Sequence, residues 1–310
     1  MVIPSRVDIR EVGPRDGFQN EPEIVPTERK VELIEMLART GLRRLEVTSF
    51  VRPDVIPQLA DANEVLERID VPEEVALSVL IPNERGLERA LELRESISRG
   101  RRAFDEINVF LSASETHNRK NVNRSVGESL DSLEIVLKRA RVAGLRCQAV
   151  ISTSFGCPYE GHISPQRVLD IATRLRDAGA QEIGFGDTTG MANPVQVADL
   201  FSLWSAELDD VQLTAHFHNT RGQALANVLA ALEVGVASFE SSFGELGGCP
   251  VPAGATGNVA TEDLVSMLHE MAIDTGIDLD ALLACARRVQ DVLGRPLGSH
   301  TLVAGPIDWR

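Results

Sequence analysis

Two histidines, His216 and His218, stand one residue apart in the segment VQLTAHFHN. Alternate residues of a β-strand point to the same face, so both imidazoles can reach one metal ion if this segment is a strand. A purely structural role is the alternative, because histidines are often half-buried and hydrogen-bonded. The pair therefore indicates a metal site only if further ligands come from elsewhere in the chain.

A second segment, GGCPVPAGATGNVATEDLV at residues 247–265, supplies candidates for such ligands. It is rich in Gly and Pro, contains Cys249 and Asn258, and continues directly into a helical pattern. Long structured loops that follow a strand often carry catalytic or binding residues. An apolar strand, a histidine pair and this loop together predict the rim of an active site.

Apolar, strand-like runs and amphipathic, helix-like runs alternate along the whole chain. The predicted strands are residues 6–12, 43–50, 75–81, 105–113, 145–153, 181–187, 211–218 and 236–243. The clearest helical patterns are residues 27–41, 125–144, 164–179, 193–208 and 221–235, and several of them end in Gly. Glycine is the usual residue where a helix stops in the left-handed conformation.

Eight such strand–helix units predict a single-domain TIM (β/α)8 barrel over residues 1–310, with extra C-terminal helices from about residue 259. A doubly wound open sheet is the alternative, but no G-x-G-x-x-G follows the first strand. A barrel of this kind keeps its chemistry at the C-terminal ends of its strands. The polar residues there are Arg15, Asp16, Glu46, Asp187, His216 and His218, followed by Cys249 and Asn258 in the last loop.

One carboxylate, two imidazoles and an amide oxygen form a mixed set of ligands that suits Mg²⁺ or Mn²⁺, with Zn²⁺ as a further candidate. Each residue also has a simpler interpretation. Asp16 could fix a turn, and Asn258 could cap the following helix. Cys249 could be a small buried apolar residue, and Asp187 could only brace a Thr-rich turn.

The composition is that of an ordinary globular protein, with 43% hydrophobic and 25% charged residues among 310. A net charge of −15 argues against nucleic acid as a partner. No run approaches the roughly 18 apolar residues that span a bilayer, so we expect no membrane association. Four cysteines without disulfide spacing and an N-terminus without an apolar signal region predict a cytoplasmic protein.

Several segments resemble one family over about residues 6–270. They are REVGPRDGFQNE, EVTSFVRP, SASE, GCPYEG, HFHNTRGQALAN and GGCPxxxGATGNVATEDLV, and in this order they are similar to 3-hydroxy-3-methylglutaryl-CoA lyases. The resemblance implies metal-dependent cleavage of 3-hydroxy-3-methylglutaryl-CoA to acetyl-CoA and acetoacetate. It implies that a divalent cation is held by Asp16, His216, His218 and Asn258.

The same resemblance assigns roles to the other candidates. Arg15 would stabilise developing negative charge, Glu46 would support the metal site, and Cys249 would take part in proton transfer. The base that accepts the hydroxyl proton would be Asp16 or His216. A homodimer is also expected from the resemblance.

Lysine is scarce, so the phosphates of an acyl-CoA would have to meet mainly arginines. Arg52, Lys120 and Arg124 follow the second and fourth strands, on the rim where the substrate would enter. A run such as NRKNVNR is also typical of a solvated loop.

Some residues differ from the usual lyase pattern. Asn219 follows the histidine pair where the lyases usually have Asp, and His117 and Glu245 resemble the isopropylmalate and homocitrate synthases. These differences leave open a larger 3-substituted 3-hydroxyglutaryl-CoA as substrate, or an acyl-CoA condensing synthase. A catalytically silent barrel that binds acyl-CoA or an oligomeric partner is a third alternative.

Overall fold

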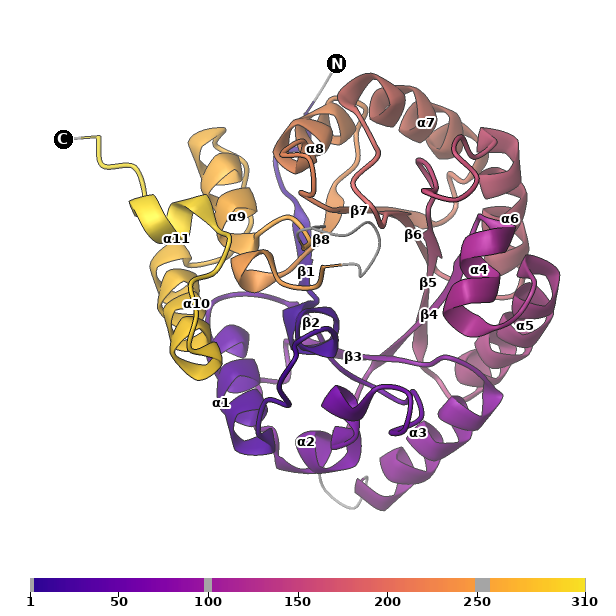
Figure 1. The fold of residues 1–310 in the computed structure, drawn as a ribbon, viewed down its shortest axis with the longest axis horizontal. Helices are drawn as coiled ribbons and strands as arrows, with labels where there is room; N and C mark the ends of the chain where they lie inside the picture. The colour runs from indigo at the N-terminus through magenta and orange to yellow at the C-terminus, as the bar shows by residue number, and fades with distance from the viewer. Residues whose placement is uncertain (1–2, 98–101, 249–256, 310) are drawn as a thin grey trace.

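The computed structural model describes residues 3–97, 102–248 and 257–309. Within these ranges, eight parallel strands pair in sequence order and close into a barrel through β1 and β8 (Figure 1). The strands are β1 Asp8–Glu11, β2 Arg44–Ser49, β3 Ala76–Leu80, β4 Glu106–Ser112, β5 Arg146–Ser152, β6 Glu182–Asp187, β7 Gln212–Phe217 and β8 Ser238–Ser241. Each predicted strand is confirmed, and closure of the barrel excludes the open-sheet alternative.

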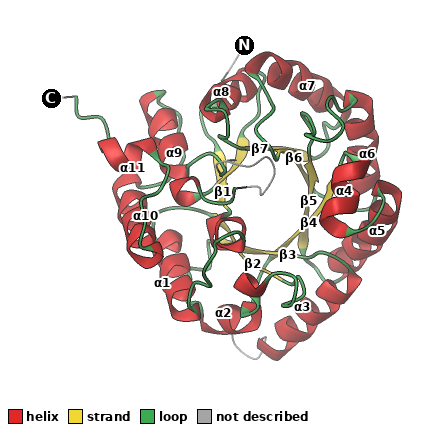
Figure 2. Cartoon of the chain, viewed as in Figure 1, coloured by secondary structure: helices red, strands yellow, loops and turns green. Residues whose placement is uncertain are grey.

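Helices surround the barrel, as Figure 2 shows in red outside the yellow ring of strands. They are α1 Thr27–Ala38, α2 Ala62–Arg68, α3 Glu84–Ile97, α4 Glu115–Val122, α5 Val126–Val142, α6 Pro165–Asp177, α7 Pro194–Glu207, α8 Ala224–Glu233, α9 Thr261–Glu270, α10 Leu279–Leu293 and α11 His300–Ala304. The predicted helices are confirmed with ends that differ by a few residues. The short helices α2, α4 and α11 and the charge-rich α3 were not singled out from the sequence.

Local sequence explains where these helices begin and end. The Ser125 side chain accepts from Glu128 N, and Glu128 accepts from Ser125 N, which forms a capping box at the start of α5. After α1 the chain turns at Gly41 with a φ of 96°, and a Cβ there would lie 2.1 Å from the Gly276 carbonyl oxygen. Only glycine fits this position without moving the backbone.

The C-terminal helices are part of the outer layer. In Figure 1, α9, α10 and α11 lie between α8 and α1, outside β8 and β1. Contacts join α10 to α1 and α9, and α11 to α9. No helix within the described ranges is long and apolar enough to cross a membrane.

The inside of the barrel is charged. Arg10 from β1 reaches Glu106 of β4, Glu182 of β6 and Glu240 of β8, and all four residues are buried. Side chains from strands on opposite sides can meet in this way only within the barrel. Such charges are tolerated because each one is paired.

Candidate active site

A turn of π-helix places Arg15 and Asp16 at the C-terminal end of β1. This turn, η1, spans Gly13–Gly17 and follows the strand almost directly. Single turns of π-helix are rare and are found frequently at functional sites. Here both side chains lie at the end of the barrel where β7 also terminates.

His216 lies in the last part of β7, His218 follows directly after the strand, and both are buried. Their Nε2 atoms are 3.1 Å apart, so the two imidazoles point at one spot. Asp16 completes a group in which one ligand atom from each residue lies within 4.8 Å of the others. The structure therefore brings the ligand atoms of three of the four predicted metal ligands close together.

Asn258 joins this group from the segment after β8. Residues 257–259 run beside the end of β7, with Val259 N donating to Phe217 O and Asn219 N donating to Gly257 O. Asn258 Nδ2 donates to Asp16 Oδ2 at 2.8 Å and to Leu246 O at 2.9 Å. The alternative that Asn258 caps a helix is wrong, because α9 is preceded by Ala260 in the cap position.

These four residues fit a divalent cation. Asn258 Oδ1 is buried and has no hydrogen-bond partner among the described residues. A buried amide oxygen without a partner is costly, and a cation would satisfy it. Together with a carboxylate and two ring nitrogens it gives the mixed oxygen and nitrogen donors that Mg²⁺, Mn²⁺ or Zn²⁺ accept.

Burial lowers the pKa of His216, but its hydrogen bond to Glu240 and the charge of Glu240 raise this pKa overall, so a cation would displace the His216 proton. The electrostatics of Asp16 and His218 suit a cation directly. Burial by itself raises the pKa of Asp16, but the charges of Arg15 and His216 outweigh it and lower the pKa. Burial and the charge of His216 lower the pKa of His218 to about 3. An ionised carboxylate and a neutral imidazole are the forms that bind metals.

Glu46 lies against Arg15 rather than against the three metal-ligand candidates. Arg15 Nε donates to Glu46 Oε1 at 2.8 Å and Nη2 donates to Oε2 at 3.2 Å, while Nη1 donates to Asp16 Oδ1 at 2.6 Å. Asn108 Nδ2 lies 3.4 Å from both Glu46 oxygens. The contacts of Glu46 thus fix the guanidinium, and through it the Asp16 carboxylate.

Glu240 belongs to the site and was not predicted. His216 Nδ1 donates to Glu240 Oε2 at 2.9 Å, from the neighbouring strand β8. Burial raises the pKa of Glu240, but the hydrogen bond and charge of His216, and the charge of Arg10, lower it to about 2. The signal available in the sequence was an acidic residue inside an otherwise apolar predicted strand.

A cavity of about 790 Å³ opens above this group. Its lining includes Arg15, Asp16, His216, His218 and Glu240, and also the three basic residues expected to meet phosphates: Arg52, Lys120 and Arg124. Arg52 is exposed and paired with Asp54, whereas Lys120 Nζ lies 4.8 Å from the centroid of the Tyr159 ring. The structure therefore places these basic residues around the same cavity as the metal-ligand candidates.

Comparison with known proteins assigns this arrangement to a family. The sequence profile of the HMGL-like family matches residues 6–289, most of the chain. The chain belongs to the HMGL-like family. It is 46% identical to hydroxymethylglutaryl-CoA lyase YngG of Bacillus subtilis over 302 residues, 97% of this chain and 98% of that protein.

Solved structures of HMG-CoA lyases have the same fold as this HMGL-like chain. The Bacillus subtilis HMG-CoA lyase superposes with a TM-score of 0.93 at 46% identity, covering 98% of this chain and 99% of that one. The enzyme from Acinetobacter baumannii, in complex with coenzyme A and 3-methylmalate, gives a TM-score of 0.92 at 40% identity. That match covers 100% of this chain and 98% of the other.

Cys249 and Asp187 are the remaining candidate residues of this HMGL-like protein. Cys249 lies outside the described residues. Asp187 braces the turn after β6, because its Oδ1 accepts from Met191 N at 2.7 Å and Ala192 N at 3.0 Å. Burial, the main cause, raises the pKa of Asp187 to about 7.

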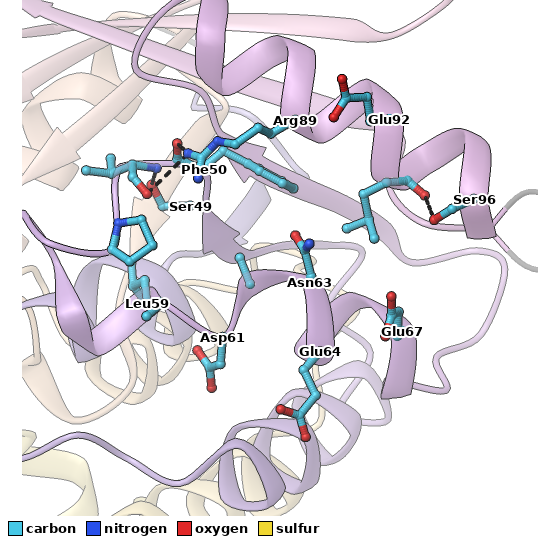
Figure 3. A pocket seen from close by; sticks show the side chains of 15 residues that line it. Ser49, Phe50, Leu59, Asp61, Asn63, Glu64, Glu67, Arg89, Glu92 and Ser96 are labelled. Atoms are coloured by element: carbon cyan, nitrogen blue, oxygen red, sulfur yellow. Dashed lines mark hydrogen bonds between the residues drawn. The ribbon is translucent and has the colours of Figure 1, made fainter.

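A second cavity, of about 710 Å³, lies between α2 and α3 and is drawn in Figure 3. Arg89 reaches across it from α3 and donates to the carbonyl oxygens of Phe50 and Val51. Val51 lines both cavities, so Arg89 holds the loop after β2 from behind. No metal-ligand candidate lines this cavity, and we do not assign the chemistry of the HMGL-like fold to it.

Proposed function

We propose that this chain is a metal-dependent hydroxymethylglutaryl-CoA lyase, cleaving 3-hydroxy-3-methylglutaryl-CoA to acetyl-CoA and acetoacetate. The observation that carries the proposal is the convergence of Asp16, His216 and His218, with the open Asn258 Oδ1 beside them, under a cavity with basic residues. The close sequence similarity to proteins named for this reaction supports it.

The reaction breaks the bond between C2 and C3 of the acyl chain. The tertiary hydroxyl loses its proton, the C3 oxygen becomes the ketone of acetoacetate, and the bonding electrons leave with the acetyl-CoA fragment as an enolate. Bound at Asp16, His216, His218 and Asn258, a divalent cation would lower the pKa of the hydroxyl and orient the substrate oxygens. The residues around it handle the proton and the charge.

The hydroxyl proton passes to Asp16 in this proposal, because Nε2 of His216 is needed to hold the cation. The hydrogen bond from Nδ1 to Glu240 leaves Nε2 as the one ring nitrogen of His216 that can hold the cation. Arg15, held by Glu46, directs a fixed guanidinium toward the site and stabilises the enolate oxygen. Cys249 is the proposed acid that returns a proton to the enolate carbon.

The basic residues around the cavity bind the coenzyme A part of the substrate in this proposal. Arg52, Lys120 and Arg124 offer positive charge to its phosphates. His117 also lines the cavity, and its Nδ1 is buried with no hydrogen-bond partner in the described part of the chain.

Asn219, which replaces the Asp usual in the lyases, lies away from the cavity that would hold the substrate. Its Oδ1 accepts from Ala224 N at 3.3 Å, at the start of α8, and Asn219 is not among the residues that line the cavity. The Asn219 difference therefore gives no argument for an acyl-CoA condensing synthase of the isopropylmalate or homocitrate type.

The test is a coupled assay on 3-hydroxy-3-methylglutaryl-CoA with Mg²⁺ or Mn²⁺ that measures acetoacetate. We expect metal-dependent product that is lost in His216→Ala and Cys249→Ala. A metal-loaded protein that forms no acetoacetate but releases free coenzyme A from acetyl-CoA and a 2-oxo acid would overturn the proposal in favour of the synthase. Activity found only on 3-hydroxyacyl-CoA thioesters with a larger 3-substituent would keep the lyase reaction but change the assigned substrate.

We further propose that residues 1–310 act as one catalytic domain, and that the protein is a cytoplasmic homodimer. Cys147, Cys157 and Cys285 are all buried and unpaired, which suits a reducing compartment. The exposed apolar side chains of Val303, Ile307 and Trp309 near the C-terminus are available to a second subunit. Light scattering of the purified protein, with a mass twice that of the chain, tests the dimer.

A further inference from the structure

A layer of charged side chains crosses the inside of the barrel beneath the metal-ligand candidates. Arg10 Nη2 donates to Glu106 Oε2 at 2.8 Å and lies 3.4 Å from Glu182 Oε2. Arg44 Nη2 donates to the same two oxygens, at 2.8 Å and 2.5 Å. Only Arg10 of these two arginines extends upward to Glu240, with Nη1 at 3.2 Å from Oε1.

Glu240 connects this layer to the site, because its two oxygens face opposite directions. Oε2 accepts from His216 Nδ1 at 2.9 Å. Oε1 accepts from Gln148 Nε2 at 2.6 Å and from Arg10 Nη1. Glu240 is only 2% exposed, so water does not compete for these positions.

The consequence for His216 is a fixed ring. With Nδ1–H directed at Glu240, the imidazole cannot turn over, and its Nε2 lone pair points at His218 Nε2 and Asp16. His218 lacks such support, because its Nδ1 has no hydrogen-bond partner among the described residues. Of the two histidines, His216 is therefore the one whose direction the barrel itself sets.

We propose that Glu240, Gln148 and Arg10 are positioning residues of the divalent-cation site. Glu240 fixes the tautomer and direction of His216, and Gln148 and Arg10 hold Glu240 from behind. The inference rests on the proposed function, because it concerns the metal site of that enzyme. Partners of metal-bound histidines generally affect metal affinity by 10–100-fold.

A carboxylate is required at Glu240 on this account. It offers acceptors in both directions, whereas an amide in its place would turn an NH₂ group toward either His216 Nδ1–H or the two donors below. Glu240→Gln should therefore disturb the site with almost no change of volume. Glu240→Asp keeps both acceptors and should retain more affinity.

The experiment measures Mn²⁺ binding to the full-length, metal-free protein by the EPR signal of free Mn²⁺, without any turnover. We expect Glu240→Gln to bind Mn²⁺ about 10–100-fold more weakly. Gln148→Leu, a milder change, should weaken binding in the same direction by a smaller factor. If Glu240→Gln does not fold, Gln148→Leu and Glu240→Asp decide the question.

Arg44→Met is the matched control. It breaks the same charged layer at Glu106 and Glu182, and within the described part of the chain Arg44 makes no hydrogen bond to Glu240. We expect Arg10→Met and Arg44→Met both to lower the unfolding midpoint, and only Arg10→Met to weaken Mn²⁺ binding. Equal affinities for the two variants would overturn the role of Arg10.

Failure of this inference differs from failure of the proposed function. If Mn²⁺ binds wild type and is lost in His216→Ala, but Glu240→Gln and Gln148→Leu bind it as tightly as wild type, the positioning role is wrong and the metal site stands. If wild type binds no Mn²⁺ at micromolar to millimolar concentrations, the metal site itself is wrong.

Discussion

Arg15 combines a structural and a chemical task in one side chain. Its guanidinium donates to both oxygens of the buried Glu46 and to Asp16, so three of its donors are already directed. A rigid, planar fork of this kind stabilises charge without reorganising during the reaction. Lysine has a single ammonium group and cannot make this set of contacts.

Arg15→Lys should therefore lower kcat for acetoacetate formation by about 100-fold or more, with a smaller effect on KM. Steady-state kinetics with saturating metal measures both constants. The comparison is Arg52→Lys, an exposed arginine at the rim that keeps its charge and should change KM at most modestly. A loss at Arg15 that falls on KM alone would show that this residue binds substrate without acting in the transition state.

At the scale of elements, the strands were predictable because each is a short apolar run between turn residues. The missed helices have local reasons. The segment of α3 is rich in Glu and Arg, and α4 begins directly after β4 with a Ser114 cap, where a loop was expected. α4 shows no strong apolar stripe, so its packing against the barrel decides its conformation. α3 does bury Leu87, Ala90 and Leu93 along one face, and this stripe was overlooked among its many charged residues.

Glu240 and Arg10 could not be assigned for a different reason. Their partners come from other strands, and the Arg10–Glu240 contact joins residues 230 positions apart. Sequence spacing carries no information on which charged residues pair across the barrel. The sequence does show that Arg10, Glu106, Glu182 and Glu240 stand within predicted strands. The histidine pair, by contrast, was predictable because the two-residue period of a strand acts locally.

Two glycines that follow helices separate two costs of adding a side chain, namely the left-handed backbone conformation and the steric clash with neighbouring atoms. Gly41 and Gly144 have φ values of 96° and 77°, but only a Cβ at Gly41 would meet other atoms within 4 Å. Gly144→Ala should cost about 1 kcal/mol for the left-handed conformation alone. Gly41→Ala should cost clearly more, since the Gly276 carbonyl must move, and urea unfolding at constant m measures both. Equal losses would contradict the packing argument.

Two buried carboxyls at the junction of β1, β8 and α9 should make stability depend on pH. Glu262 accepts from Gly244 N with both oxygens, and burial is the main cause that raises its pKa to about 8. Burial likewise raises the pKa of Glu11 to about 7. The fold thus favours the protonated forms, so their contribution is complete below about pH 4 and is lost as pH rises toward 8.

Glu262→Gln removes one of these groups. Wild type loses the contribution of the protonated Glu262 as the pH rises, and the variant has no such contribution to lose. The unfolding free energy of the variant minus that of wild type should therefore increase between pH 5 and pH 8, whatever its value at pH 5. Chemical denaturation at a series of pH values measures this trend. Ser266→Ala on the same helix removes no titrating group and should follow wild type. A constant difference between Glu262→Gln and wild type would mean that Glu262 is ionised in the fold throughout this range.

For the molecule as a whole, the metal site ties the end of β1, the end of β7 and the segment after β8 together. A ligand that binds only the folded barrel stabilises it by about 2.7 kcal/mol at a concentration 100 times its Kd. For a chain of this size that corresponds to a rise in Tm of roughly 5 °C. Mn²⁺ added to the metal-free protein should produce this shift, and a chelator should reverse it.

His218→Ala decides whether that shift comes from the proposed site. The protein carries a net charge of −15, so weak binding of cations to its surface is expected in any case. Surface binding would raise Tm equally in wild type and variant, and added salt would suppress it. Binding at the proposed site requires the His218 imidazole, so the saturable rise in Tm should disappear in His218→Ala. Each rise is measured from the Tm of the same protein without metal, so that a loss of stability in the variant is not mistaken for a loss of binding.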